Sequence, residues 1–218
     1  MDNLTNNMNK ADLKICFLLK VEDNFYTEFE IWQKLANLRK LAEAGKVDFY
    51  TTDGALSIQY LDEELLGIGL WNEMVPTIEN ILALFNNLIS GETISEFLQL
   101  QSCWIRLTRK GKTQLLYELE STTSRRSISL KRLLPFEEFI REFFLMYYRT
   151  VRILSALGSE SFTKVEIEWQ EHLSPKVITI VGMENLTRLM TSPLNEILIC
   201  RPQNVATLFL YDNSDRTK

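Results

Sequence analysis

The longest regular pattern of apolar positions runs from Pro135 to Gly158. Apolar residues recur there at steps of three and four, which is the spacing of one face of an α-helix. The residues of this face are Phe136, Phe139, Ile140, Phe143, Tyr147, Val151 and Leu154. Phe144, Met146 and Tyr148 add apolar surface beside it, so we expect more than one side to be covered. The helix would be about 34 Å long at roughly 1.5 Å per residue, and we expect a sheet to lie against it.

Residues at both ends of this stretch fit the ends of a helix. Pro135 suits the first helical position, where its missing N–H costs nothing. Glu137 and Glu138 would lie in the first turn, where the helix dipole favours negative charge. Gly158 can end the helix in a left-handed conformation.

The pattern before the long helix predicts two more amphipathic helices and several strands. Thr27 and Glu30 have the spacing of a capping box, which favours a helix over 27–45. Its inward residues would be Phe29, Trp32, Leu35, Ala36 and Leu38. A second helix is expected over 72–89, with Pro76 in its first turn. The expected strands are 13–21, 47–51, 55–61, 97–108, 113–120 and 127–133, with turns at 52–54 and 109–112 and with 62–64 ending the third strand.

The pattern after Gly158 is weaker. Residues 162–173 fit a strand and a helix equally, and β-branched residues favour a strand over 176–181. A short helix over 184–190 and strands over 195–200 and 205–211 would follow. The fold class expected from all of this is α+β, an antiparallel meander packed on the long aromatic helix. We predict a core domain over 12–158 and flexible tails at 1–11 and 213–218. A strand-rich C-terminal αβ extension over 159–212 would pack on the core, either as a separate unit or as part of the same domain.

Composition is that of an ordinary soluble protein. The chain has 218 residues, of which 45% are hydrophobic and 24% charged, and its net charge is −5. Cys16, Cys103 and Cys200 are far apart in apolar runs, which indicates reduced buried thiols rather than disulfides. The first ten residues lack the apolar core of a signal peptide, and no apolar run reaches the ~18 residues of a membrane span. We therefore expect a cytoplasmic protein.

Signatures of catalysis are missing from the sequence. His172 is the one histidine, which argues against a histidine-based catalytic or metal site. Gly67 and Gly69 form a lone G-x-G without the rest of a phosphate-binding loop. Carboxylates cluster at 62–64, at 137–138 and at 166 and 168, but no Glu-x-Lys pattern of a metal nuclease accompanies them. We expect no cofactor, no metal and no enzyme activity, although a hydrolase that uses only carboxylates stays open.

Charge is segregated along the chain. Between Val47 and Ile105 there are nine acidic residues and no lysine or arginine. Between Arg106 and Arg132 there are eight basic residues against Glu118 and Glu120. Such segregation produces a local field that steers partners of opposite charge. The alternative is that the two segments fold against each other and neutralise, since neighbours in sequence are often neighbours in space.

Two interaction hypotheses follow from this charge pattern. The first is a non-enzymatic protein that binds a basic protein partner, as an inhibitor or immunity protein for a basic toxin would. Its acidic face would be Asp53, Asp62, Glu63, Glu64, Glu73 and Glu79. The second is a nucleic-acid binder or assembly subunit with a basic patch on the 106–132 hairpin. That patch would be Arg106, Arg109, Lys110, Lys112, Arg125 and Arg126.

The tryptophans leave one question open. Trp32, Trp71, Trp104 and Trp169 could belong to the core, which is the more frequent place for aromatic residues, or could line a pocket. A tryptophan at the surface would instead indicate a binding hot spot.

Overall fold

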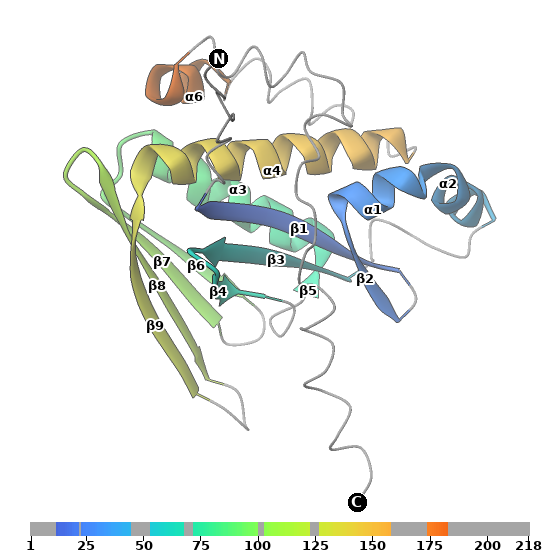
Figure 1. The fold of residues 1–218 in the computed structure, drawn as a ribbon, viewed down its shortest axis with the longest axis horizontal. Coiled ribbons are helices and arrows are strands. Elements are labelled where there is room, and N and C mark those ends of the chain that lie inside the picture. Colours follow the sequence, from blue (N-terminus) through green and yellow to red (C-terminus); the bar gives the residue numbers. More distant parts are fainter. Residues whose placement is uncertain are drawn as a thin grey trace, which may run out of the picture.

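Two antiparallel sheets and a long helix form most of the described structure (Figure 1). The structure is a computed structural model that describes residues 12–21, 23–44, 53–67, 72–99, 103–122, 127–157 and 174–182. The helices are α1 (Glu28–Gln33), α2 (Leu35–Glu43), α3 (Met74–Ile89), α4 (Phe136–Ala156) and α6 (Ser174–Val181). The strands are β1 (Leu13–Val21), β2 (Asn24–Thr27), β3 (Asp53–Tyr60), β4 (Glu63–Leu66), β5 (Asn72–Glu73), β6 (Ile94–Gln99), β7 (Cys103–Lys110), β8 (Gln114–Thr122) and β9 (Ser127–Pro135). The α+β class with antiparallel strands on a long helix is therefore confirmed.

The two sheets are separate in strand order and meet at β4. The first has the order β2-β1-β3-β4, with β5 paired to β3, and the second is the meander β6-β7-β8-β9. Tyr117 on β8 donates a hydrogen bond from its hydroxyl to the carbonyl oxygen of Leu65 on β4 (3.5 Å). Arg132 on β9 binds the carboxylate of Glu63 on β4 through two nitrogens. These two contacts, one buried and one exposed, help to join the meander to the first sheet.

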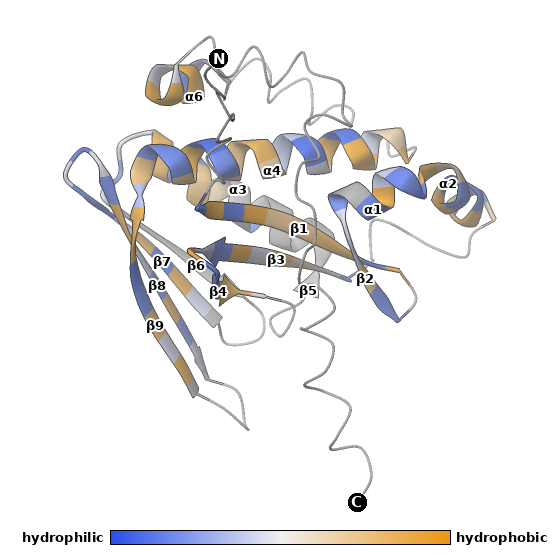
Figure 2. Ribbon diagram, in the orientation of Figure 1, coloured by the Kyte–Doolittle hydropathy of each residue, from blue (hydrophilic) through white to orange (hydrophobic). Residues whose placement is uncertain are grey.

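Helix α4 is the centre of the core. Every residue of the predicted face is buried, and so are Phe144, Met146 and Tyr148. The helix packs against β1, α1, α6, β8 and β9. Figure 1 shows α6 on the side of α4 that faces away from the strands, and Figure 2 shows apolar residues in stripes along α4 and over much of β1. The expectation that more than one side of this helix is covered is confirmed, while Pro135 occupies the N-cap position rather than the first helical one.

Side chains from α1 and α4 complete the hydrogen bonding of β1. Strand β2 pairs with the second half of β1, from Leu18 onward, so among the described strands the first half has a partner on one edge. On the other edge the N–H of Leu13 donates to Glu138 (3.2 Å) and the N–H of Phe17 donates to Glu28 (3.0 Å). Between them Arg149 donates to the carbonyl oxygen of Ile15 (3.1 Å). An unpaired buried backbone group is costly. The need to pair these backbone groups of β1 explains why charged side chains lie inside the core.

The capping box predicted at Thr27 is confirmed. The N–H of Glu30 donates to the Thr27 hydroxyl (3.3 Å), and the Thr27 N–H donates to the Glu30 carboxylate (2.8 Å). The helix that follows is not continuous to residue 45, because it is interrupted at Lys34 and divided into α1 and α2. Leu38 is buried as predicted, whereas Ala36 is exposed and Ile31 is buried in its place.

Replacing Thr27 by alanine should lower the free energy of unfolding by about 1 kcal/mol, since the hydroxyl accepts an otherwise unpaired helix N–H. Urea unfolding followed by circular dichroism measures this change. Thr27→Ser keeps the hydroxyl and should stay close to the wild type. Equal stability of the alanine and serine variants would show that the cap contributes nothing.

Three predicted strand boundaries are wrong. The run 97–108 is not one strand but the antiparallel pair β6 and β7, with Phe97 opposite Ile105. Asp62 lies in a two-residue turn with Leu61, and Glu63 and Glu64 begin β4 instead of ending a strand. Both turn residues have positive φ, 49° and 66°, as a type I′ hairpin requires. Residues 53 and 54, which we expected in a turn, belong to β3.

The predicted strand 176–181 is also wrong, because these residues belong to helix α6. Val177 and Val181 are four residues apart and both are buried, and α6 packs against α4. Tertiary packing of this apolar face therefore outweighs the β-propensity of the branched side chains.

Several predictions lie outside the described residues. They are the strands 47–51, 195–200 and 205–211, the helix 184–190, the ambiguous segment 162–173, Gly158 and both tails. The division at residues 158–159 also stays a prediction. Among the described helices, none has the length and apolarity to cross a membrane.

Candidate functional site: the outer face of the second sheet

The outer face of the β6–β9 sheet is built by alternation along its strands. On β7, Ile105 and Leu107 are buried against the core, while Trp104, Arg106 and Lys110 are exposed. Residues directly opposite each other on neighbouring strands share a face, so the register aligns the outer side chains in rows across the sheet.

One row consists of charges that alternate in sign. Glu96 on β6 is opposite Arg106, Arg106 is opposite Glu118 on β8, and Glu118 is opposite Lys131 on β9. The ammonium of Lys131 lies 2.5 Å from the Glu118 carboxylate. This hydrogen bond lowers the pKa of Glu118 against the effect of partial burial, and it raises the pKa of Lys131. Opposite charges in directly opposite positions stabilise a sheet, so Glu118 is compensated within this row by Lys131 and faces Arg106 on its other side.

The adjacent row contains an exposed tryptophan. Trp104 is opposite Leu98 on β6 and Glu120 on β8. The side chain of Trp104 is 46% exposed, although tryptophan is usually well covered. On the other side of the charged row, Leu133 is 51% exposed.

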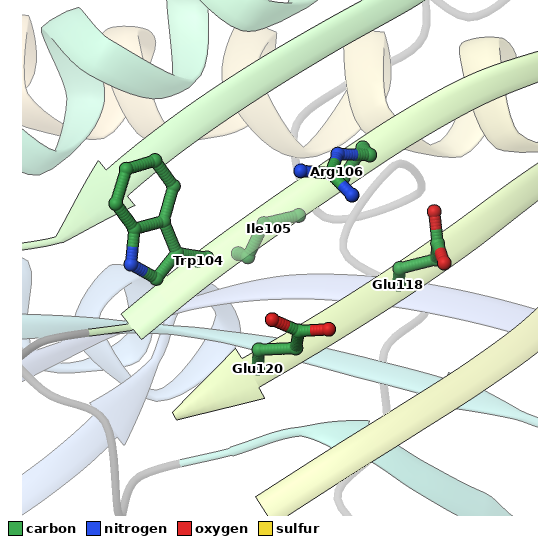
Figure 3. Close-up of a pocket in the computed structure, with 5 residues that line it drawn as sticks. All are labelled: Trp104, Ile105, Arg106, Glu118 and Glu120. Carbon is green, nitrogen blue, oxygen red and sulfur yellow. The ribbon is translucent and has the colours of Figure 1, made fainter. Parts of the chain in front are cut away.

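A hollow of about 320 Å³ opens beside Trp104. Its lining is Trp104, Ile105, Arg106, Glu118 and Glu120. Figure 3 shows the indole and Arg106 on β7, with the two carboxylates on the neighbouring strand. The volume is at the lower end of the range for ligand pockets. A second hollow of about 10 Å³, beside Glu28 and Ile31, has room for no more than a water molecule.

Glu120 differs from the other charged groups around the hollow. Its opposite neighbours are Trp104 and Ser129, which carry no charge. It is exposed, and no salt bridge joins it to another residue in the described part of the chain. Arg106 and Lys131 are only diagonal neighbours, at about 7–8 Å between Cα atoms.

The structure separates the residues of the predicted acidic face. Asp53 on β3 lies 3.4 Å from the ammonium of Lys20 on β1. Glu63 binds Arg132, 69 residues later in the sequence, at 2.5 Å. The hydrogen bond from Arg132 lowers the pKa of Glu63. This contact joins the acidic and basic segments. At this pair the structure agrees with the alternative hypothesis, in which the two segments neutralise each other.

Asp62 and Glu64 are exposed near the β3–β4 turn. Partial burial raises the pKa of Glu64, whose carboxylate lies against the backbone of Gly67, where a Cβ would collide with it. The side chains of Glu73 and Glu79, the other two residues of the predicted acidic face, lie outside the described part of the structure. That this face binds a basic partner stays a prediction.

The predicted basic patch is also divided. The guanidinium of Arg109 lies 4.3 Å from the centre of the Phe136 ring, and its Nε donates to the carbonyl oxygen of Gly111 (3.1 Å). Arg106 belongs to the row of alternating charges. Lys110 and Lys112 are exposed at the β7–β8 turn, and Arg125 and Arg126 lie outside the described residues.

Reasoning from the sequence left the place of Trp104 open between core, pocket and surface, and it did not single out Glu120. The available signal was parity, since Trp104 shares its position in the strand alternation with Arg106 and not with Ile105. Among the described residues no group of three metal-binding side chains occurs, Cys16 is not part of a disulfide, and His172 lies outside them. The expectations about metals, cofactors and catalysis stay predictions.

We compared the chain with protein-family models, characterised proteins and solved structures, and none of them gives a significant match.

Proposed function

We propose that this protein is a non-enzymatic interaction module that binds a basic protein partner through the outer face of the β6–β9 sheet. The observation that supports this most is the 46% exposure of Trp104 at the edge of a hollow with Glu118 and Glu120 in its lining. Tryptophan and arginine are enriched in the residues that dominate binding at protein interfaces.

Other features of the same face suit a protein partner. Leu133 adds exposed apolar surface, and Glu118 with Lys131 supplies charges that are already paired within the sheet. An apolar anchor with a polar surround is the usual arrangement of an interface. The strands of a sheet also hold this face rigid, so little ordering would be needed on binding.

The acidic face near the β3–β4 turn supports the proposal less. Asp53 and Glu63 are ion-paired within the chain, so charge reversal at Glu63 would also break a link between the sheets. Asp62→Lys with Glu64→Lys tests this face and leaves Glu63 in place. Nucleic acid is less well supported, because Arg109 packs on Phe136 and Arg132 binds Glu63. An inhibitor or immunity role is one form of the proposed module.

Replacing Trp104 by alanine should weaken partner binding by roughly 10-fold or more, because tryptophan is enriched among the residues whose truncation costs an interface most. The measurement is quantitative affinity capture from extracts of the source organism, followed by titration of each captured protein with the purified chain. We expect the captured proteins to be basic and their binding to be lost with this variant.

A matched control is Leu61→Asn. Leu61 is 60% exposed but lies on the first sheet at the β3–β4 turn, where asparagine tolerates the positive φ. This variant should bind like the wild type. If Trp104→Ala captures the same proteins with the same affinities as Leu61→Asn, the proposed interface is wrong. If only the Asp62→Lys and Glu64→Lys pair loses binding, the partner uses the acidic face instead.

A further inference from the structure

We infer that the hollow between Trp104 and Glu120 receives the guanidinium of an arginine side chain of the partner. This inference rests on the proposed function, because it assigns the chemistry that the outer face would recognise. It follows from the geometry of the two residues, from the charges around them and from the size of the hollow.

The geometry combines an aromatic ring with a carboxylate. Trp104 and Glu120 are directly opposite on β7 and β8, which places their Cβ atoms about 4.5–5.5 Å apart on one face. Both line the hollow, and Figure 3 shows them on the same side of the sheet. A planar guanidinium can stack on an indole while its N–H groups bind a carboxylate in a fork. An ammonium would serve the carboxylate but would lack the stacking plane.

Among the described residues around the hollow, Glu120 is the carboxylate without an ion pair, and only the more distant Lys131 acts on it through its charge. Glu118 binds Lys131 and is also opposite Arg106. Arg106 in turn lies between Glu96 and Glu118 in the register. Glu120 has no cation in either opposite position, so a positively charged guest complements it. An anionic guest would be repelled, and an apolar guest would bury the Glu120 carboxylate without a partner.

The size of the hollow fits one side chain. A volume of about 320 Å³ is at the lower end of the range for small-molecule pockets. Such pockets usually bury most of a ligand that is larger than the head group of one side chain. A metal ion is a poor alternative, since Glu118 is already ion-paired and indole is not a usual ligand. We therefore assign the hollow to a single arginine head group with its accompanying water.

The test uses the purified chain labelled with ¹⁵N. Trp104→Phe identifies the indole N–H signal of Trp104 among those of the four tryptophans. The probe is N-acetyl-arginine methylamide, and the matched probe is the citrulline derivative, which has nearly the same shape without the charge. The arginine probe should shift the Trp104 signal in a saturable manner, and the shift should weaken with added salt. The citrulline probe should cause no such shift, and the Trp32 signal, identified in the same way by Trp32→Phe, should stay constant with both.

Variants then separate the carboxylate from general acidity. Glu120→Gln should lower the affinity for the arginine probe by about threefold, which is the effect expected for an exposed ion pair. Glu92→Gln, at another exposed acidic position, should leave this affinity unchanged. Absence of a shift with arginine, an equal shift with citrulline, or equal affinity in Glu120→Gln and the wild type would each overturn the inference.

The two proposals can fail separately. If capture of the partner depends on Trp104 but the arginine probe leaves the indole signal unchanged, the proposed interface is supported and the assignment of an arginine to the hollow is wrong. If the probe binds at Trp104 and Glu120 but capture does not depend on Trp104, the proposed function falls and only an affinity of the hollow for cations is left.

Discussion

Replacing Arg149 by methionine should lower the free energy of unfolding by about 3–5 kcal/mol at neutral pH, the usual loss when one partner of a buried ion pair is removed. Arg149 and Glu28 are both buried, with 3% and 1% of their surfaces exposed. The guanidinium lies 3.7 Å from the Glu28 carboxylate and donates to the carbonyl oxygen of Ile15. Methionine has a comparable shape, so the loss would come from the charge and its hydrogen bonds and not from a cavity.

The loss should depend on pH. Burial raises the pKa of Glu28 above its ordinary value of 4.5, and Arg149 opposes this shift. Without Arg149 the pKa of Glu28 in the folded state must rise further. Well below pH 4.5, the folded and unfolded states both hold this proton, and the penalty is small. As pH increases, the unfolded state releases the proton while the folded state retains it, so stability falls until pH passes the folded-state pKa.

Denaturant titrations at pH 5 and pH 7.5 check this prediction against the wild type at the same pH. The control is the double variant Glu28→Gln with Arg149→Met, which removes both charges and keeps an oxygen for the N–H of Phe17. It should recover most of the loss, since replacing a whole buried pair is often close to neutral, and it should lose the extra pH dependence. A single variant that is equally destabilised at both pH values would contradict the proposed role of Glu28.

Elements with a clear period and clear ends could be predicted from the sequence. Strand β1 has the predicted bounds, and α4 has the predicted buried face. The β7–β8 turn was visible because Gly111 marks it, and Gly111 does have positive φ. The division of 97–108 into two strands was not visible, because no glycine or proline interrupts that run.

The candidate site depends on pairings that a sequence does not contain. Glu63 and Arg132 are 69 residues apart, and only the packing of β9 near β4 brings them together. The row from Glu96 to Lys131 likewise requires the register of four strands. Charge counted by segment therefore suggested two opposed surfaces, whereas the folded sheet mixes both signs on one face. The alternation of apolar and polar residues along β7 was enough to predict that Trp104 is exposed. The hypotheses were instead based on the charge of whole segments.

Replacing Phe143 by alanine should lower the free energy of unfolding by about 3–5 kcal/mol, the range for truncating a buried phenylalanine. Phe143 is 2% exposed and joins two helices. Its ring stacks on Phe85 of α3 with centroids 4.8 Å apart and is also 5.6 Å from Phe139 within α4. The variant would lose these ring contacts and leave a cavity that the stacked Phe85 cannot fill without moving α3.

Two further variants give this prediction its controls. Phe143→Leu keeps much of the apolar volume but lacks the ring, so it should lose clearly less stability than alanine. Glu137→Gln, at an exposed position of the same helix, should change the free energy of unfolding by only about 0.3–1 kcal/mol, through the helix dipole. Urea unfolding followed by circular dichroism gives all three values. Because α4 packs against both sheets and α6, we expect the alanine variant to unfold in one transition at lower urea. An alanine variant as stable as Glu137→Gln would mean that the aromatic cluster is not what holds α3 against α4.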